Sequence, residues 1–223
     1  MDKIVVPKSI LNEAEMILGE VQASASHQMN PISRRQLYRA FANASDISVR
    51  IAPRWLAVLA SQRVLPLFNQ KYPDDLSPRE FLDLAIAVLQ GKITKEVVEE
   101  KLDLAHDASS SAWCHDEREI PWPAWLAADS TYHALMEAHG YQPLDHLPPF
   151  YKNDVLTDWT DDKLCEFLGD TAAVAAMSFA YDERGLSINA DRLLEFWEWW
   201  LKEAIMECIF AAQHGYLPTS GAV

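Results

Sequence analysis

Two His-Asp pairs are the residues of this chain whose types are best suited to metal chemistry. They are His106-Asp107 and His115-Asp116, in the stretch "AHDASSSAWCHDEREI". Imidazole and carboxylate groups are ligands for divalent metals, and a bound metal can turn water into a nucleophile for hydrolysis. A helical metal-dependent hydrolase of the HD type, which uses His and Asp ligands of this kind, is therefore one candidate function.

The spacing of the two pairs argues against a shared metal. A helix end is expected near Ser110, and pairs nine positions apart on a broken helix do not face the same point. Solvated loop residues are the more ordinary interpretation. The other histidines are scattered, and no HExxH, GxSxG, glycine-rich phosphate loop or cysteine-histidine zinc spacing is present. We therefore predict no catalytic residue, no metal and no cofactor.

Acidic clusters carry the other chemistry that the sequence offers. Three of them, at residues 74–75, 99–100 and 182–183, fit solvated turns or first helical turns. The fourth differs because Trp159 lies among its carboxylates, and an aromatic side chain in an acidic loop suits a partner rich in Arg and Lys. The candidate residues for binding a basic protein are Asp74, Asp75, Asp158, Trp159, Asp161 and Asp162.

The net charge favours a protein partner over nucleic acid. Asp and Glu number 33 against 19 Lys and Arg, which gives a formal charge of −14. Phosphate contacts need Lys and Arg to release counterions, so we expect no direct binding of DNA or RNA. An acidic surface attracts a basic protein over a long range. Solubility is the alternative explanation of the charge.

Three tryptophans crowd the stretch "LLEFWEWWLKEA": Trp197, Trp199 and Trp200. On a helical wheel one continuous apolar arc is formed by Leu193, Trp197, Trp200, Leu201, Ala204 and Cys208. Trp199 points away from that arc, on the bearing of Met206 and Phe210. The crowding is typical of a central core helix. The alternative for Trp199 is a pocket or an interface, because exposed tryptophan is a frequent binding hot spot, and this makes Trp199 a further candidate binding residue.

The elements that must hold these residues are predicted to be helices. The chain has only 7 Gly in 223 residues, while Ala and Leu, which cost least in a helix, are abundant. We predict an all-α single domain, residues 1–223, in which the Trp-rich C-terminal helix is central to a bundle of roughly seven to nine helices. The predicted helices span about 8–24, 33–44, 49–72, 77–91, 94–108, 124–139, 161–181 and 189–213.

Local signals set several of these boundaries. Pro66 removes a backbone hydrogen bond, so a kink or a break is expected there. Ser33 is expected to open one helix. Ser77 is expected to cap another, with Glu80 completing a capping box and Gly91 ending the helix. The stretch 113–160 is richer in Pro and aromatic residues and is interpreted as an insert.

The cytoplasm is the predicted location. The N-terminus "MDKIVVPKSILNEAE" lacks the apolar core of a secretory signal, and no run is long enough to span a membrane. The three cysteines, Cys114, Cys165 and Cys208, are odd in number and fit free thiols in a reducing compartment. A monomer and a homodimer both remain open.

The stretch from about 50 to 101 carries a family resemblance. An Arg/Ala-rich helix ends in "VLPLF", the turn "YPDDLSP" follows, and the next helix closes on Gly with the step "GKI". This arrangement resembles the helical immunity proteins of bacterial polymorphic-toxin systems, in particular the family numbered five in that series. The resemblance covers about a quarter of the chain.

What the resemblance implies is a non-enzymatic cytoplasmic protein that binds and neutralises a cognate toxin. The candidate binding residues named above then become candidate toxin-binding residues. Many such toxins are nucleases with a basic substrate cleft, which an acidic surface can occupy, and this link rests on charge alone. The alternatives are the HD-like hydrolase and a helical adaptor or small-ligand binder with a pocket lined by Trp122, Trp125 and Trp199.

Overall fold

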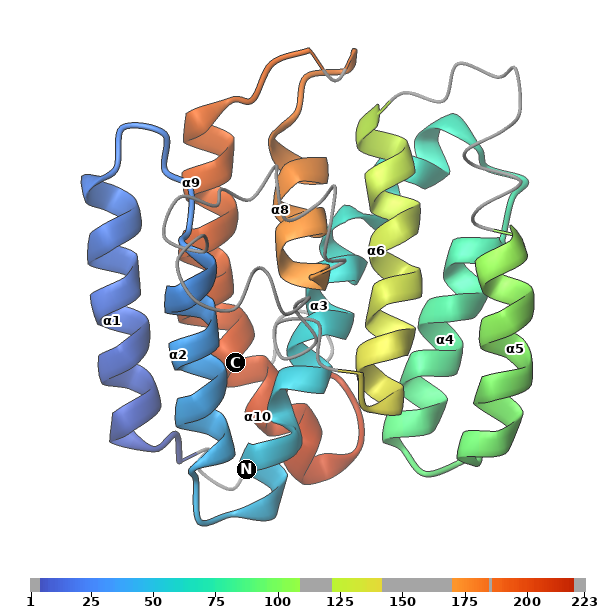
Figure 1. Ribbon diagram of the computed structural model, residues 1–223, viewed down its shortest axis with the longest axis horizontal. Coiled ribbons are helices and arrows are strands. Elements are labelled where there is room, and N and C mark those ends of the chain that lie inside the picture. Colours follow the sequence, from blue (N-terminus) through green and yellow to red (C-terminus); the bar gives the residue numbers. More distant parts are fainter. Residues whose placement is uncertain (1–4, 109–121, 142–169, 185, 219–223) are drawn as a thin grey trace, which may run out of the picture.

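The computed structural model describes residues 5–108, 122–141, 170–184 and 186–218, and these residues are largely helical (Figure 1). The helices are α1 (Lys8–Ala23), α2 (Pro31–Ala42), α3 (Ile47–Lys71), α4 (Ser77–Leu89), α5 (Lys95–Ala108), α6 (Trp122–His139), α8 (Thr171–Ala180), α9 (Ala190–Trp199), η5 (Trp200–Ala204) and α10 (Ile205–His214). The last three follow one another without a break, and η5 is a π-helical turn. Within the described ranges β-structure is limited to the isolated bridge Tyr181–Ile188. The prediction of an all-α, multi-helix fold is confirmed.

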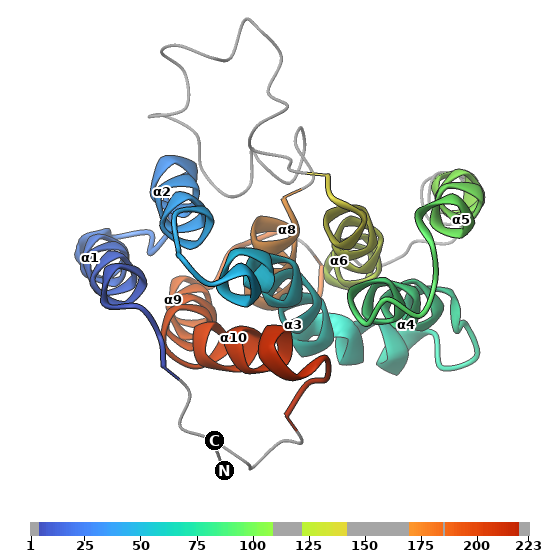
Figure 2. The ribbon, with the colours of Figure 1, turned by 90° about the horizontal axis from the view of Figure 1, so that it is seen from below.

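Helix α3 is the one around which the others are arranged. In Figure 2, which looks along the helices, α2, α4, α6, α8 and α10 surround α3, while α1 and α5 lie at the two outer ends. The seven consecutive side chains from Trp55 to Ser61 are all buried, although they point in every direction around the helix axis. Such a helix must be apolar on all sides, which explains the run "WLAVLA".

The Trp-rich C-terminal helix buries the arc that the helical wheel predicts. Trp197 and Trp200 have no exposed surface, and their rings meet edge to face with centroids 5.5 Å apart. The remaining members of the arc are also buried: Leu193, Leu201, Ala204 and Cys208. The second stripe, formed by Trp199, Met206 and Phe210, is half-buried. The crowding of tryptophans therefore serves mainly to pack this helix against its neighbours.

Pro66 does not interrupt α3. The helix runs through Pro53 and Pro66 to Lys71, so of the two predicted outcomes at Pro66, a kink or a break, the break does not occur. The Pro66 side chain is exposed, and the carbonyl that loses its hydrogen bond to the proline can therefore be satisfied by water. The long helix is held by its buried residues on both sides of the proline, and local strain at one exposed position is not enough to end it.

The predicted start of α4 is also wrong in detail. Leu76 occupies the N-cap position and makes no side-chain cap. The Asp75 carboxylate accepts hydrogen bonds from the Ser77 N–H at 3.0 Å and from the Ser77 hydroxyl at 2.7 Å, so Asp75 organises this turn instead of Ser77. The predicted end is confirmed, because Gly91 takes a left-handed φ of 65° just past the last helical residues.

Two other helix starts differ from the predictions for a similar reason. Helix α2 starts at Pro31, with Asn30 accepting a hydrogen bond from the Ile32 N–H at 2.8 Å, whereas Ser33 donates to Glu20. Helix α8 starts at Thr171, and Asp170 accepts from the Ala172 N–H at 3.1 Å. In both cases an Asn or Asp side chain satisfies an N–H that the first helical turn leaves unpaired.

Candidate functional site

Most of the predicted site residues in the aromatic-rich region lie outside the part of the chain that the structure describes. This holds for Asp158, Trp159, Asp161 and Asp162, and for the His115-Asp116 pair. His106 and Asp107 belong to α5, but their side chains are not described. Within the described residues, no group of three or more His, Cys, Asp or Glu side chains could hold a metal ion. The same residues include no helix long and apolar enough to cross a membrane.

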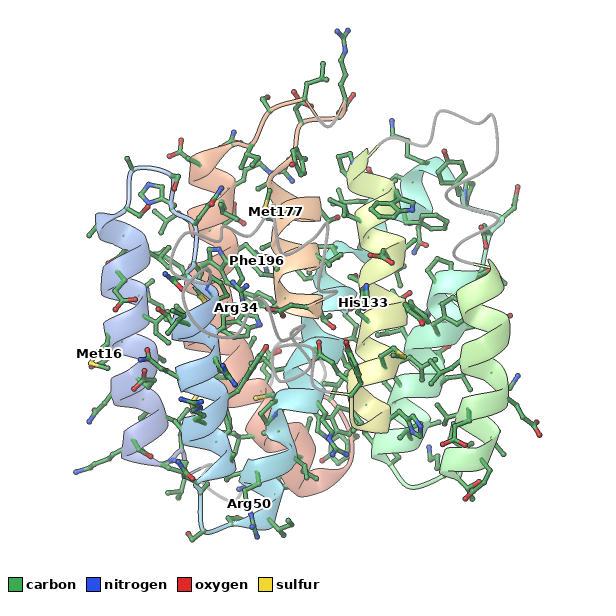
Figure 3. The ribbon with its side chains drawn as sticks, in the orientation of Figure 1. Met16, Arg34, Arg50, His133, Met177 and Phe196 are labelled. Carbon is green, nitrogen blue, oxygen red and sulfur yellow. The ribbon has the colours of Figure 1, made fainter. Side chains whose placement is uncertain are left out.

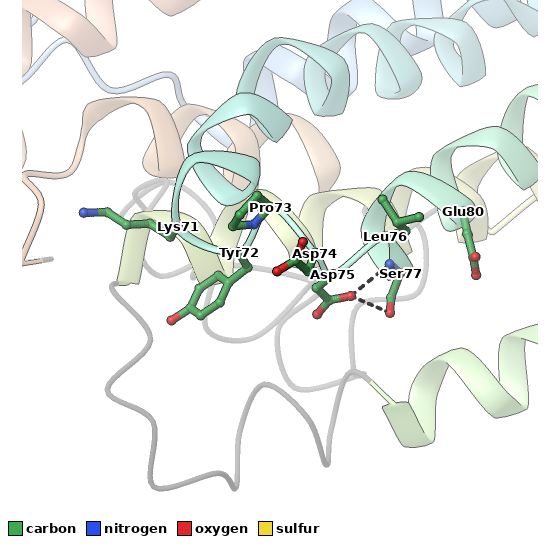
Figure 4. Close-up of a pocket in the computed structure, with 8 residues that line it drawn as sticks. All are labelled: Lys71, Tyr72, Pro73, Asp74, Asp75, Leu76, Ser77 and Glu80. Carbon is green, nitrogen blue, oxygen red and sulfur yellow. Dashed lines mark hydrogen bonds between the residues drawn. The ribbon is translucent and has the colours of Figure 1, made fainter.

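Asp74 and Asp75 lie in the turn between α3 and α4, where they line a shallow open pocket (Figure 4). We call this pocket the α3–α4 groove, and its lining residues are Lys71, Tyr72, Pro73, Asp74, Asp75, Leu76, Ser77 and Glu80. The two aspartates differ in role. Asp75 is half-buried and tied to Ser77, whereas Asp74 is exposed and has no hydrogen-bond or ion-pair partner among the described residues. Asp74 is therefore a free negative charge beside the exposed Leu76 side chain.

Trp199 lies on a different part of the surface and is not a lining residue of the α3–α4 groove. The Arg63 guanidinium of α3 sits 4.5 Å from the centroid of the Trp199 ring, and it also forms an ion pair with Glu195 at 3.1 Å. Phe196 meets the Trp199 ring edge-on, with centroids 5.6 Å apart. Trp199 thus helps to join α9 to α3, while part of its surface stays exposed.

The structure also contains a buried ionic centre that the sequence did not point to. It consists of Arg34 on α2, Asp170 at the start of α8 and Glu137 on α6. The Arg34 Nε donates to Asp170 Oδ2 at 2.7 Å, and neither side chain has any exposed surface. Arg34 also donates to the Met29 carbonyl at 3.1 Å, and its guanidinium lies 5.4 Å from the Trp197 ring centroid. Figure 3 shows Arg34 directed from α2 into the interior of the fold.

Glu137 completes this centre from the opposite side. Its Oε1 accepts hydrogen bonds from both the backbone N–H and the hydroxyl of Thr171, the first residue of α8. Burial, and then the negative charge of Asp170, raise the pKa of Glu137 from 4.5 to about 7. The same two causes raise the pKa of the neighbouring Tyr38 well above its ordinary value. Burial and the Asp170 charge therefore favour a proton on Glu137, and they outweigh the Thr171 hydrogen bonds and the charge of His133, which act in the opposite direction.

His133 and Asp129 form a second polar pair on α6, one turn apart. The His133 Nε2 lies 3.3 Å from Asp129 Oδ2. Burial by itself would lower the pKa of His133, but the charge of Asp129 and the hydrogen bond to it raise the pKa overall. The pair places an acidic and a basic side chain one turn apart on the same helix face, an arrangement found in many helices.

The chemistry open to the ionic centre is limited by its burial. Arg34 and Asp170 are wholly buried and Glu137 is 8% exposed, so a substrate has no direct approach to their charged groups. What the three residues do is connect α2, α6 and α8 through hydrogen bonds at the start of α8. The position of Asp170 just before the helical run "TAAVAAM" is typical of an N-cap residue and could have been recognised in the sequence. Its ion pair with Arg34 could not, because the two residues are 136 positions apart and share no local sequence pattern.

Comparison with known proteins extends the resemblance well beyond the stretch 50–101. The family model described as "Immunity protein Imm5" matches residues 14–207, which run from α1 into α10 and include the ionic centre. No curated protein matches the chain. The match covers most of the 223 residues and agrees with the all-α fold. The chain belongs to the Immunity protein Imm5 family.

Proposed function

We propose that this chain is a non-enzymatic immunity protein, which acts in the cytoplasm by binding a cognate toxin of a polymorphic-toxin system and blocking it. The observation that carries the proposal is the family match over residues 14–207. The buried position of the ionic centre supports it, because the most strongly perturbed carboxylate of the described chain, Glu137, is used inside the fold and not at an open site. We therefore expect the toxin to bind at the surface of the protein.

The charge of the chain indicates the chemistry of the toxin. A protein with a formal charge of −14 is drawn toward a basic partner, and electrostatic steering raises the rate of their encounter. A fast encounter matters for an inhibitor that must stop a toxin before it acts. A nuclease with a basic substrate cleft is the class that this charge fits best.

The α3–α4 groove is the candidate contact surface within the described residues. Asp74 and Glu80 supply exposed negative charge, while Leu76, which is 61% exposed, and the half-buried Tyr72 supply apolar contact area. An apolar centre with a charged rim is the usual composition of a protein interface. The candidates Asp158, Trp159, Asp161, Asp162 and Trp199 would extend the contact.

Growth rescue tests this function. The proposal expects a toxin domain to be encoded immediately upstream of this gene, and that domain is expressed from an inducible promoter, with and without this chain. The proposal expects growth to stop with the toxin alone and to continue when this chain is present. An unrelated toxin from another system serves as a control, since this chain should give no protection against it. Continued growth arrest in the presence of folded, soluble chain would refute the proposal.

A further inference from the structure

One face of the C-terminal helix combines carboxylates and aromatic rings on the surface. Glu203, Glu207, Phe210 and His214 follow each other at steps of four, three and four residues, which places them along one side of the helix. Tyr216 follows directly after the helix. Glu203 and His214 are exposed, and Glu207 and Phe210 are half-buried. We call these five residues the outer stripe.

The aromatic end of the outer stripe is a preformed platform. The Phe210 and His214 rings are stacked, with centroids 4.2 Å apart, and Tyr216 meets the Phe210 ring edge-on at 5.5 Å. The turn that carries Tyr216 is held in place because the Gln90 side chain donates to the Gly215 carbonyl at 2.9 Å. Tyr216 nevertheless keeps 53% of its surface exposed. Rings that are already ordered lose little conformational entropy when a partner covers them.

The acidic end of the stripe holds two neighbouring carboxylates. Within the described chain, neither Glu203 nor Glu207 forms an ion pair, and the two carboxylates lie one turn apart on the same helix face. Burial, together with the charge of Glu203, raises the pKa of Glu207. A cation placed between the two carboxylates would relieve their repulsion, and the same cation could lie against the nearby aromatic rings.

The surroundings of the stripe leave room for a partner. In Figure 2, α10 lies at the edge of the helix array with α3 on its inner side, and none of the helices that the structure describes lies against its outer side. From Glu203 to His214 the stripe is roughly 16 Å long, at 1.5 Å per helical residue. This length suits the central part of a protein interface of standard size.

We infer that the outer stripe binds a Lys- or Arg-bearing segment of the cognate toxin, an inference that rests on the proposed function. The charge of the stripe selects a cationic partner over a second copy of the chain, because two copies would bring like carboxylate pairs together. Phe210, His214 and Tyr216 lie beyond residues 14–207, which the family model matches.

The outer stripe is separate from the α3–α4 groove, so the two surfaces can be tested independently. The groove lies at the start of α4, whereas Gln90 at the end of α4 bonds to the turn below the stripe. The two ends of this helix of 13 residues are roughly 20 Å apart. Substitutions in one surface therefore leave the contacts of the other unchanged.

Titration calorimetry with the upstream toxin domain tests the inference. We expect Glu203→Gln/Glu207→Gln, and separately Phe210→Ala, to raise the Kd by about thirtyfold, as for interface hot spots. Tyr216→Ala should act in the same direction, and it removes a ring that lies outside the helix and cannot unfold it. The matched control is Glu96→Gln/Glu100→Gln on α5, which removes the same charge at the same spacing from another exposed helix face. This control should change the Kd by less than about twofold.

The outcomes separate this inference from the proposed function. If the wild-type chain forms no complex, the proposed function fails and the inference fails with it. If the wild type binds and all three stripe variants bind equally well, the inference alone is overturned. Light scattering of the free chain measures its oligomeric state. A homodimer that becomes a monomer on Phe210→Ala or Tyr216→Ala would show that a second copy of the chain occupies the stripe. That result also overturns the inference.

Discussion

The Arg34 guanidinium and the Asp170 carboxylate form an ion pair of 2.7 Å in which neither side chain has any exposed surface. The pair joins α2 to the first turn of α8, and Glu137 holds the same turn from α6. Three helices that are distant in sequence are thus held by charge and hydrogen bonds at one point. This centre therefore fixes the relative positions of α2, α6 and α8.

Removing one partner of this ion pair should strongly reduce the stability of the folded protein. Arg34→Met leaves Asp170 buried without its cation, and we expect the free energy of unfolding to fall by about 3–5 kcal/mol. The measurement is urea denaturation followed by circular dichroism. The double variant Arg34→Met/Asp170→Asn keeps a side-chain acceptor for the Ala172 N–H and should recover part of the loss. A single variant as stable as the wild type would contradict this role.

Glu137 should make the stability depend on pH. Because the folded pKa of about 7 exceeds the ordinary value of 4.5, the contribution of Glu137 is fully present below pH 4.5 and is lost as the pH rises to 7. The difference amounts to roughly 3 kcal/mol at most. Glu137→Gln keeps an oxygen for Thr171 and removes the titration. Urea midpoints at pH 5 and pH 8 should therefore lie closer together in the variant, while the raised pKa of His133 leaves part of the difference in the same direction. An unchanged pH dependence would count against the buried, protonated Glu137.

The two neighbouring tryptophans should respond differently to truncation. Trp197→Ala empties a fully buried position and should cost about 3–5 kcal/mol of stability. Trp199→Ala removes a half-buried ring and its contact with Arg63, so its effect on stability should be smaller. Thermal unfolding of both variants measures the difference. If Trp199 contacts the toxin as predicted, Trp199→Ala also weakens toxin binding under conditions where the variant is folded, and unchanged binding would remove it from the candidate residues.

Substitution of Asp74 tests whether the α3–α4 groove contacts the toxin. Asp74→Asn removes an exposed charge without disturbing the Asp75–Ser77 hydrogen bonds, and we expect the Kd for the toxin domain to rise by about fivefold, mostly through slower association. Asp191→Asn removes the same charge from an exposed position on α9 and serves as the control. Association rates at low and high salt provide the measurement. Equal rates for the two variants would exclude Asp74 from the interface.

Asn30 should stabilise α2 as its N-cap. Asn30→Ala removes the acceptor for the Ile32 N–H and is expected to lower the free energy of unfolding by about 1 kcal/mol. Asn30→Asp keeps an acceptor at the same place and should remain close to wild type. Chemical denaturation of the two variants side by side is the check, and equal losses in both would argue against the cap.

Local sequence patterns predicted much of the fold because helices are built from local interactions. The three- and four-residue periodicity located the helices, and the wheel of the C-terminal helix identified its buried arc from Leu193 to Cys208. The errors lie at helix starts, where several nearby side chains compete for the same N–H groups. Asp75 organises the turn expected of Ser77, and Asn30 caps the helix expected to open at Ser33. The helix continues through Pro66 because buried residues on both sides of it hold the helix in the core.

The ionic centre could not be predicted from the sequence, because its members share no local pattern. Arg34 and Asp170 are 136 positions apart, and either residue alone resembles an ordinary surface charge. The same limit applies to the outer stripe. The wheel places Phe210 on the bearing of Trp199 and Met206, but its edge-on contact with Tyr216 depends on the turn at Gly215, whose geometry appears only in three dimensions.

The most direct test of the central claim is the activity of the purified upstream toxin domain, measured against increasing amounts of this chain. The proposed function predicts that activity falls linearly and reaches zero at a fixed molar ratio, as expected for a tight inhibitory complex without turnover. Full toxin activity at an excess of folded chain would contradict it. Inhibition at amounts far below that ratio would contradict it as well, because only an enzyme acts catalytically.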